Sequence, residues 1–214
     1  MHGPYDWYFD FISPFSWLHW ARLRRDHSEI VLNPKPVLLA AILNHWGQLG
    51  PAELPGKRVH TYRQVLWQAR QLGIPLHFPP THPFNPLAAL RLCLAAPDRT
   101  QATDAIFRHI WEDGRAGDSI EALADVAEAL GIADPAAAVA DPAVKAALAA
   151  NGAEAIALQA FGVPTLVVDD HLFWGNDATP MLLDYLDHRD LFDDAQMRLL
   201  DSIPIGVQRP GAKA

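Results

Sequence analysis

The sequence is poor in cysteine, because Cys93 is the single thiol among its 214 residues. One cysteine can form neither an intramolecular disulfide nor a Cys-X-X-Cys redox pair, so the chain cannot exchange disulfides with thiols of its own. Cys93 stands between Leu92 and Leu94, which favours a buried apolar role for its side chain.

Long apolar runs and clustered positive charge are also missing. No apolar stretch approaches the roughly 20 residues of a membrane span. The first residues show no basic region followed by an apolar segment, as a secretory signal would. Lys and Arg number 17 against 25 Asp and Glu, a formal net charge of −8, whereas nucleic-acid binding uses clustered Lys and Arg. We expect a cytoplasmic protein with neither membrane nor nucleic acid among its partners.

Motifs for metals and nucleotides do not occur either. The ten histidines include no His-X-X-X-His pair, and His77 and His82 flank two prolines at a spacing that suits zinc poorly. Neither Gly-X-Gly-X-X-Gly nor a P-loop appears in the sequence. We therefore expect no metal site and no dinucleotide or ATP site.

The sequence opens with a β–α–β pattern. Residues 5–12 are rich in aromatics with partial alternation, which is typical of a strand. Ser13 and Pro14 are the residue types of a helix N-cap and a first helical position, and apolar residues recur at helical spacing after them. A second strand is expected over residues 30–37. Because its two prolines cannot donate hydrogen bonds, it should lie at a sheet edge or break early.

The middle of the chain has a different composition. Residues 38–159 are rich in Ala, Leu and Arg and contain few β-branched residues, which predicts a helical region. The expected helices cover residues 38–45, 56–72, 86–95, 100–112, 119–130 and 142–159.

The end of the chain returns to β structure. Two β-rich runs, 165–168 and 171–174, flank an acidic dipeptide and predict a hairpin, followed by a helix over about 179–189. The complete order predicts an α/β thioredoxin-like fold (β-α-β... β-β-α) with a large all-α insertion. We expect a discontinuous thioredoxin-like domain, 1–37 and 160–214, around an inserted helical domain, 38–159.

Ser13, at the junction of the first strand and the first helix, is the first candidate site residue. Unpaired N–H groups and a partial positive charge make a helix start favourable for an anion, and a thiol placed there loses its proton more easily. Serine stands at both ends of the segment Ser13-Pro14-Phe15-Ser16. A serine hydroxyl can stabilise a neighbouring sulfur anion and cannot form a disulfide with it. The simpler interpretation is that Ser13 only caps the helix.

Two further segments carry candidate residues. In a thioredoxin arrangement Pro164 is expected to be cis and to face the start of the first helix, which leaves the main chain of Val163 for a peptide-like ligand. An ordinary trans proline is the alternative. Asn176 and Asp177 precede the last helix, where such residues usually act as caps. The Asp177 carboxylate suits a ligand ammonium, and the helix start suits a ligand carboxylate.

At these residues the chain resembles a known family. The segments 9–18, 161–165 and 174–177 resemble the 2-hydroxychromene-2-carboxylate isomerase family, which is related to the kappa-class glutathione transferases and more distantly to the DsbA-type proteins. Segments 54–58, 72–76 and 82–87 add to the resemblance. Each motif alone is weak, but their joint order, from about residue 5 to residue 188, is specific for the family.

The resemblance implies a homodimeric isomerase that uses glutathione as a cofactor and acts on a small aromatic 2-oxo enoic acid. In such an enzyme a thiolate adds to the conjugated bond, the bond rotates, and elimination restores it in the trans geometry. By position, Ser13 matches the serine beside the glutathione sulfur. Val163 with Pro164 matches the backbone clamp on the cysteinyl unit, and Asn176 and Asp177 match the γ-glutamyl contacts.

A substrate pocket is expected beside the glutathione site. Lys57 and Asn85 are candidates for the substrate carboxylate and carbonyl, and Phe15, Trp46 and Trp67 are candidates for apolar walls. The simpler interpretations are a solvated lysine, a turn asparagine and packing aromatics.

The chain departs from the family pattern at two positions. Ala178 stands where the family commonly has arginine, and Gln48 stands where it commonly has asparagine, which puts the natural substrate in question. Two other functions stay open. A kappa-like transferase would consume glutathione, and a non-catalytic thiol- or peptide-binding module would show no rate change when Ser13 is replaced.

Overall fold

The computed structural model describes residues 2–200 and 202–207. Within these residues a four-stranded sheet has the order β2-β1-β3-β4. The strands are β1 (His2–Phe9), β2 (Ile30–Pro36), β3 (Thr165–Val168) and β4 (His171–Trp174). β1 and β2 are parallel, and β3 is antiparallel to both of its neighbours. The predicted thioredoxin-like order is confirmed, and the proline-bearing strand β2 lies at an edge.

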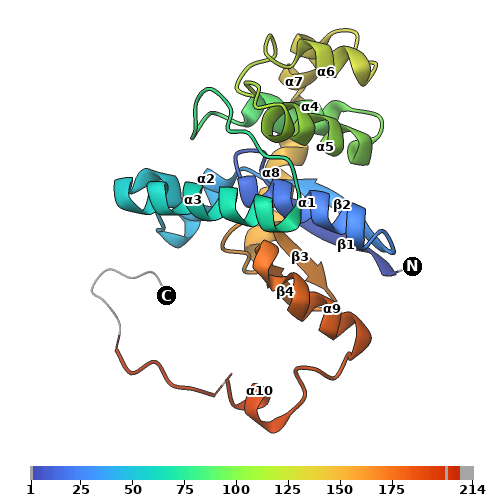
Figure 1. Ribbon diagram of the computed structural model, residues 1–214. Helices are drawn as coiled ribbons and strands as arrows, with labels where there is room; N and C mark the ends of the chain where they lie inside the picture. The colour runs from blue at the N-terminus through green and yellow to red at the C-terminus, as the bar shows by residue number, and fades with distance from the viewer. Residues whose placement is uncertain (1, 201, 208–214) are drawn as a thin grey trace.

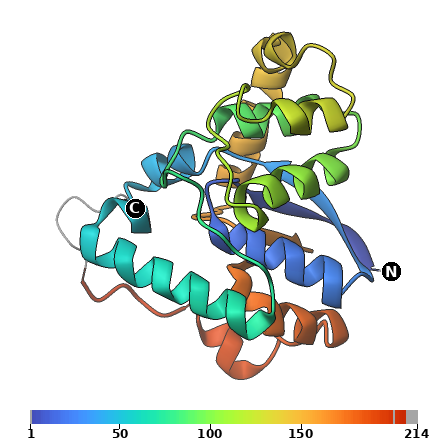
Figure 2. The ribbon, with the colours of Figure 1, turned by 45° about the horizontal axis from the view of Figure 1, so that its top comes forward.

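Helices cover both faces of this sheet, as Figures 1 and 2 show. In chain order they are α1 (Pro14–Asp26), α2 (Leu39–Trp46), the 3₁₀ turn η1 (Pro51–Glu53), α3 (Pro55–Leu72), α4 (Leu87–Ala95), α5 (Arg99–Phe107), the π-helical turn η2 (Arg108–Glu112), α6 (Ala124–Ala129), α7 (Pro135–Ala140), α8 (Pro142–Ala157), the 3₁₀ turn η3 (Asn176–Ala178), α9 (Thr179–Asp187) and α10 (Ala195–Leu200).

The alternation of side chains along β1 divides the core between the two faces. Trp7 and Phe9 are fully buried in a large core with residues of α1, α4, α5 and α9. Tyr8 points the other way, into a smaller core that contains residues of α2 and α8. Cys93, on α4, is fully buried in the large core, which confirms its predicted apolar role.

The inserted helices are joined to the sheet by packing and by hydrogen bonds. Phe107 of α5 packs against Trp7 and Phe9 of β1, and the indole N–H of Trp20 donates to Asp104 at 3.0 Å. A single core therefore extends from the sheet into the helices. The boundaries at 37/38 and 159/160 stay a prediction.

Several predicted elements differ from the observed ones. The first strand ends at Phe9 instead of residue 12, because the carboxylate of Asp10 binds the amides of Ile12 and Leu39 at 3.1 and 2.8 Å and turns the chain out of the sheet. The predicted helix 119–130 begins only at Ala124, because the Ser119 hydroxyl accepts from the Ala122 amide and caps a separate turn.

Other differences are smaller. The predicted helix 100–112 is α5 followed by the π-helical turn η2, and α7 and α10 were not predicted. The last predicted helix, α9, ends at Asp187. Residues 203–207 form no helix or strand.

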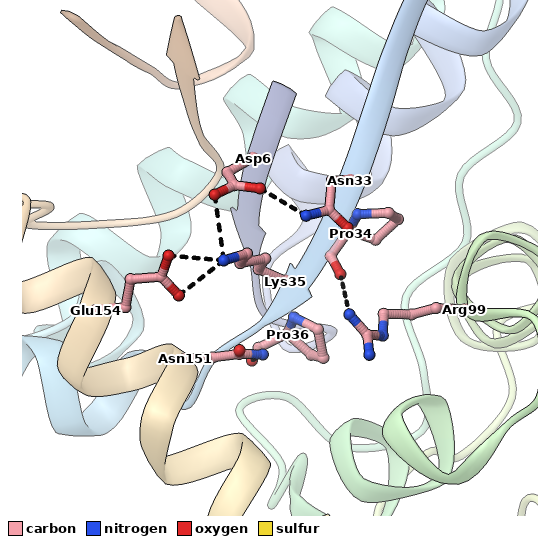
Figure 3. A network of polar contacts seen from close by, with 8 residues as sticks. All are labelled: Asp6, Asn33, Pro34, Lys35, Pro36, Arg99, Asn151 and Glu154. Carbon is pink, nitrogen blue, oxygen red and sulfur yellow. Dashed lines mark hydrogen bonds and ion pairs between the residues drawn. The ribbon is translucent and has the colours of Figure 1, made fainter. Parts of the chain in front are cut away.

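Polar contacts fasten the edge strand β2 to its neighbours (Figure 3). The Lys35 ammonium lies 3.2 Å from a carboxylate oxygen of Asp6 on β1 and 2.7 Å from one of Glu154 on α8. The carbonyls of the two β2 prolines accept hydrogen bonds from the side chains of Arg99 and Asn151. These contacts join strands β1 and β2 to helices that follow much later in the sequence.

Replacing Lys35 with methionine is expected to lower the free energy of unfolding by about 1–2 kcal/mol, because two carboxylates then lose their shared cation in a partly buried place. The measurement is urea denaturation at low and high salt. Arg198→Met is the control, because the Arg198–Asp193 pair is exposed and 3.8 Å long. Equal stabilities of the Lys35 and Arg198 variants would contradict the structural role of the network.

Candidate functional site

The register of the sheet brings three candidate segments together. Tyr8 pairs with Thr165 in the antiparallel ladder of β1 and β3, so Pro164 lies at the end of the sheet where β1 stops and α1 begins. The carbonyl of Pro164 accepts from the Gly175 amide at 2.8 Å, and Arg22 of α1 donates to the Asn176 carbonyl at 3.4 Å. The start of β3 and η3 thus lie at the end of the sheet from which α1 departs, and η3 contacts α1 at Arg22, nine residues after Ser13.

Ser13 occupies the N-cap position of α1, as the sequence predicts. Its hydroxyl oxygen accepts from the Ser16 amide at 3.2 Å, and the residue is 7% exposed. Accepting a bond leaves the hydroxyl hydrogen available, and no acceptor for it occurs in the described part of the chain. Ser13 can therefore cap the helix and donate to a ligand at the same time.

Val163 and Pro164 are joined by a cis peptide bond, as the sequence analysis expected. Val163 is 8% exposed, and among the described residues neither its amide nor its carbonyl takes part in a hydrogen bond. A buried backbone donor and acceptor without partners carry a free-energy cost that a ligand can relieve. This main chain has the hydrogen-bonding groups that an extended peptide would require.

Asn176 provides a third unpaired group. The residue is 4% exposed, and its side-chain nitrogen donates to Gln68 of α3 at 3.4 Å. Its side-chain oxygen is buried and has no partner among the described residues. The neighbouring Asp177 is exposed to solvent. A buried acceptor beside an exposed carboxylate suits a ligand ammonium.

These groups fit a small thiol peptide such as glutathione. Ser13 offers a donor at a helix start, Val163 offers a strand-like donor and acceptor, and Asn176 with Asp177 offers acceptors. The fit rests on polar atoms that lack partners within the described residues.

The five candidates for the substrate pocket lie in different settings. Phe15 is half-buried on α1, and the Trp46 indole donates to the Ala160 carbonyl at 2.8 Å. Lys57 is exposed on α3, as is Trp67, with 60% of its surface accessible. Asn85 is also exposed, and its side-chain oxygen accepts from the amide two residues later at 3.1 Å, as in a turn. Their role in substrate binding stays a prediction.

Asp10, a fully buried acid three residues before Ser13, is a residue of this region that was not predicted from the sequence. Burial raises the pKa of its carboxyl from 3.8 to about 7, although hydrogen bonds from the amides of Leu39, Ile12 and Phe11 oppose the rise. An acidic residue within the aromatic run Phe9-Asp10-Phe11 was the signal that could have revealed it.

Replacing Asp10 with asparagine is expected to flatten the pH dependence of stability. Because the folded carboxyl binds its proton more tightly than the unfolded one, the stability it contributes is present below about pH 4 and is lost as the pH rises through about 7. Denaturation at several pH values measures this loss, on the order of a few kcal/mol. A variant that loses stability over this range as steeply as the original would contradict the assignment.

Comparison with known proteins agrees with this geometry. Residues 6–187 match the DSBA-like thioredoxin domain family. The chain is 30% identical to a 2-hydroxychromene-2-carboxylate isomerase of Pseudomonas putida over 186 residues, which cover 83% of this chain and 91% of that protein. The chain belongs to the 2-hydroxychromene-2-carboxylate isomerase family.

Other relatives extend this family assignment. The isomerase of Sphingobium xenophagum is 31% identical over 191 residues, 85% of this chain and 96% of that protein. A solved 2-hydroxychromene-2-carboxylate isomerase superposes with a TM-score of 0.76 at 25% identity, covering 90% of this chain and 98% of that one. A kappa 2 glutathione transferase of Caenorhabditis elegans is 27% identical over 201 residues, 84% of this chain and 89% of that protein. The isomerase class predicted from the sequence is confirmed.

The described residues contain neither a candidate membrane span nor a candidate metal site. None of their helices is both long and apolar enough to cross a membrane. No group of three or more His, Cys, Asp or Glu side chains within that part of the chain could hold a metal ion.

Proposed function

We propose that this protein is a glutathione-dependent cis–trans isomerase of an aromatic 2-oxo enoic acid. The observation that carries the proposal is the Ser13 hydroxyl, which caps α1 and still has a hydrogen to donate. In a chain whose Cys93 is buried far from solvent, a hydroxyl at a helix start favours a sulfur anion that comes from a ligand.

When bound, glutathione supplies a thiolate that adds reversibly to the conjugated double bond of the substrate. Ser13 and the amides at the start of α1 keep that sulfur ionised by hydrogen bonding and by the helix dipole. The main chain of Val163, before Pro164, holds the cysteinyl unit in an extended form, and Asn176 with Asp177 holds the γ-glutamyl end. The chain itself thus orients the thiol and lowers its pKa.

The charge of α3 supports an anionic substrate. This helix carries Lys57, Arg58, Arg63 and Arg70 and no acidic residue, although the whole chain has a net charge of −8. None of the four cations forms an ion pair within the described residues. We assign Lys57 and Asn85 to the substrate carboxylate and carbonyl, with Phe15, Trp46 and Trp67 around its ring.

A kappa-like glutathione transferase is the second candidate function, favoured by the similarity to the Caenorhabditis elegans transferase. It would use the same groups around Ser13 but would form a stable conjugate and consume the thiol. A non-catalytic thiol-binding module would use the site without turnover. These functions differ in the fate of glutathione.

We also propose that the protein acts as a homodimer in the cytoplasm. Exposed apolar side chains after α9 support self-association, because such residues are usually covered in an assembly. They are Met197, Leu199, Leu200, Ile203, Ile205 and Val207.

The decisive experiment measures isomerisation of a hydroxychromene carboxylate with and without glutathione. We expect a strict requirement for glutathione and no loss of it over many turnovers. Ser13→Ala is expected to lower kcat/KM by about a hundredfold, because one donor to the developing anion is removed. Ser119→Ala is the matched control, because its hydroxyl also accepts from the amide three residues later, at 3.2 Å, but caps a turn in the inserted helical region.

Consumption of glutathione in proportion to product would show the transferase instead. Isomerisation that proceeds equally well without glutathione would refute the proposal, and unchanged rates in Ser13→Ala would favour the non-catalytic module.

A further inference from the structure

Side chains from distant parts of the sequence fix the short turn between β1 and Ser13. The Trp111 indole donates to the Phe11 carbonyl at 2.7 Å, and the His82 ring lies 2.8 Å from the Ile12 carbonyl. Asp10 accepts from the Ile12 amide at 3.1 Å. The backbone just before Ser13 is therefore held by side chains rather than by a sheet or helix ladder.

The contacts of His82 determine its tautomer. Its Nε2 faces the Ile12 carbonyl, which can only accept, so Nε2 carries the hydrogen. Its Nδ1 lies 2.6 Å from the hydroxyl of Tyr62, and this hydroxyl also reaches the His82 carbonyl at 2.9 Å. Burial lowers the pKa of His82, so the ring stays neutral, and Nδ1 and the His82 carbonyl are two acceptors that share the single hydroxyl hydrogen of Tyr62.

Aromatic packing keeps the His82 ring in this orientation. The ring makes edge contacts with Trp111 at 5.4 Å and with Phe78 at 5.9 Å between centroids. Tyr62 also packs against Phe78, with 4.6 Å between centroids. Because these aromatic neighbours restrict rotation of the ring, its hydrogen bond with Tyr62 also fixes its position relative to the Ile12 carbonyl.

Helix α3 reaches the site at two places. Tyr62 acts through His82 on the turn before Ser13, and Gln68, less than two turns later, accepts from the Asn176 side chain. The same helix therefore reaches the candidate ligand site near Ser13, through His82, and at Asn176, through Gln68.

We propose that Tyr62 and His82 are positioning residues that fix the Ile12 carbonyl and thereby direct the Ser13 hydroxyl toward the bound thiol. The proposal rests on the glutathione function proposed above. A charge-assisted hydrogen bond weakens steeply when its donor is displaced or tilted. Loosening the turn should therefore reduce the stabilisation of the sulfur anion without removing a group that touches it.

The test compares Tyr62→Phe with Tyr185→Phe. The control also loses a hydroxyl with a hydrogen bond, from Tyr185 to Asp169 at 2.9 Å, which lies at the other end of the sheet. His82→Gln and His82→Ala form a second pair, because glutamine keeps an N–H donor for the Ile12 carbonyl. Tyr62→Phe keeps the ring packing, so the variant is expected to fold.

The first readout uses the ligand-free protein. The amides of Ser16 and Trp17 bond to Ser13, so their hydrogen exchange reports how firmly the first turn of α1 is held. We expect exchange about tenfold faster in Tyr62→Phe and unchanged in Tyr185→Phe. Faster exchange in His82→Ala should be largely restored in His82→Gln.

The second readout uses glutathione, whose thiolate absorbs in the ultraviolet. A pH titration of the bound thiol should show a raised pKa in Tyr62→Phe and the original pKa in Tyr185→Phe. We expect kcat to fall about tenfold while KM for the aromatic substrate stays within about twofold.

The outcomes separate the two proposals. Unchanged exchange of Ser16 and Trp17 in Tyr62→Phe would overturn the positioning role whether or not glutathione binds. Faster exchange with an unaltered thiol pKa and kcat would also overturn it, since the pair would then only stabilise the fold. If the unmodified protein binds no glutathione, the proposed function fails, and the exchange data alone decide whether the pair holds Ser13.

Discussion

The structure depends on how the chain leaves the central strand β1 and enters α1 through residues 10–13, of which Asp10 and Phe11 are fully buried. A buried backbone must find partners for its amides and carbonyls, and here neither a strand nor a helix can provide them. Asp10, His82 and Trp111 supply them instead. The exit of β1 also decides the direction of α1, so the packing of Trp17 and the position of the site follow from the same contacts.

Features fixed by neighbouring residues were predictable from the sequence. Ser13 followed by proline predicts a helix start, and the repeated prolines of β2 predict an edge strand. The contacts that hold the site were not predictable, because His82 and Trp111 are separated from their carbonyl partners by 70 and 100 residues. The candidate ligand-binding residues could be named from the resemblance to a family. The residues that hold them in place, such as His82 and Trp111, form no recognisable local sequence pattern.

Two helices, α1 and α3, provide positive electrostatic potential in different ways. The start of α1 presents amides and the Ser13 hydroxyl, which suit a small anion at close range. Helix α3 presents cations on long side chains, such as Arg58 and Arg63, which act over a wider range and are screened by salt. An acidic chain that places four cations and no carboxylate on one helix can attract anionic ligands there without general attraction to polyanions.

The burial of Cys93 has a consequence for its reactivity toward other thiols and disulfides. The thiol is fully buried against Thr103, and burial raises its pKa to about 12. Thiol–disulfide exchange requires a thiolate that can be reached, so this sulfur is neither ionised nor accessible at neutral pH. A thiol brought to the protein by a ligand would therefore find no reactive cysteine of this chain with which to form a mixed disulfide.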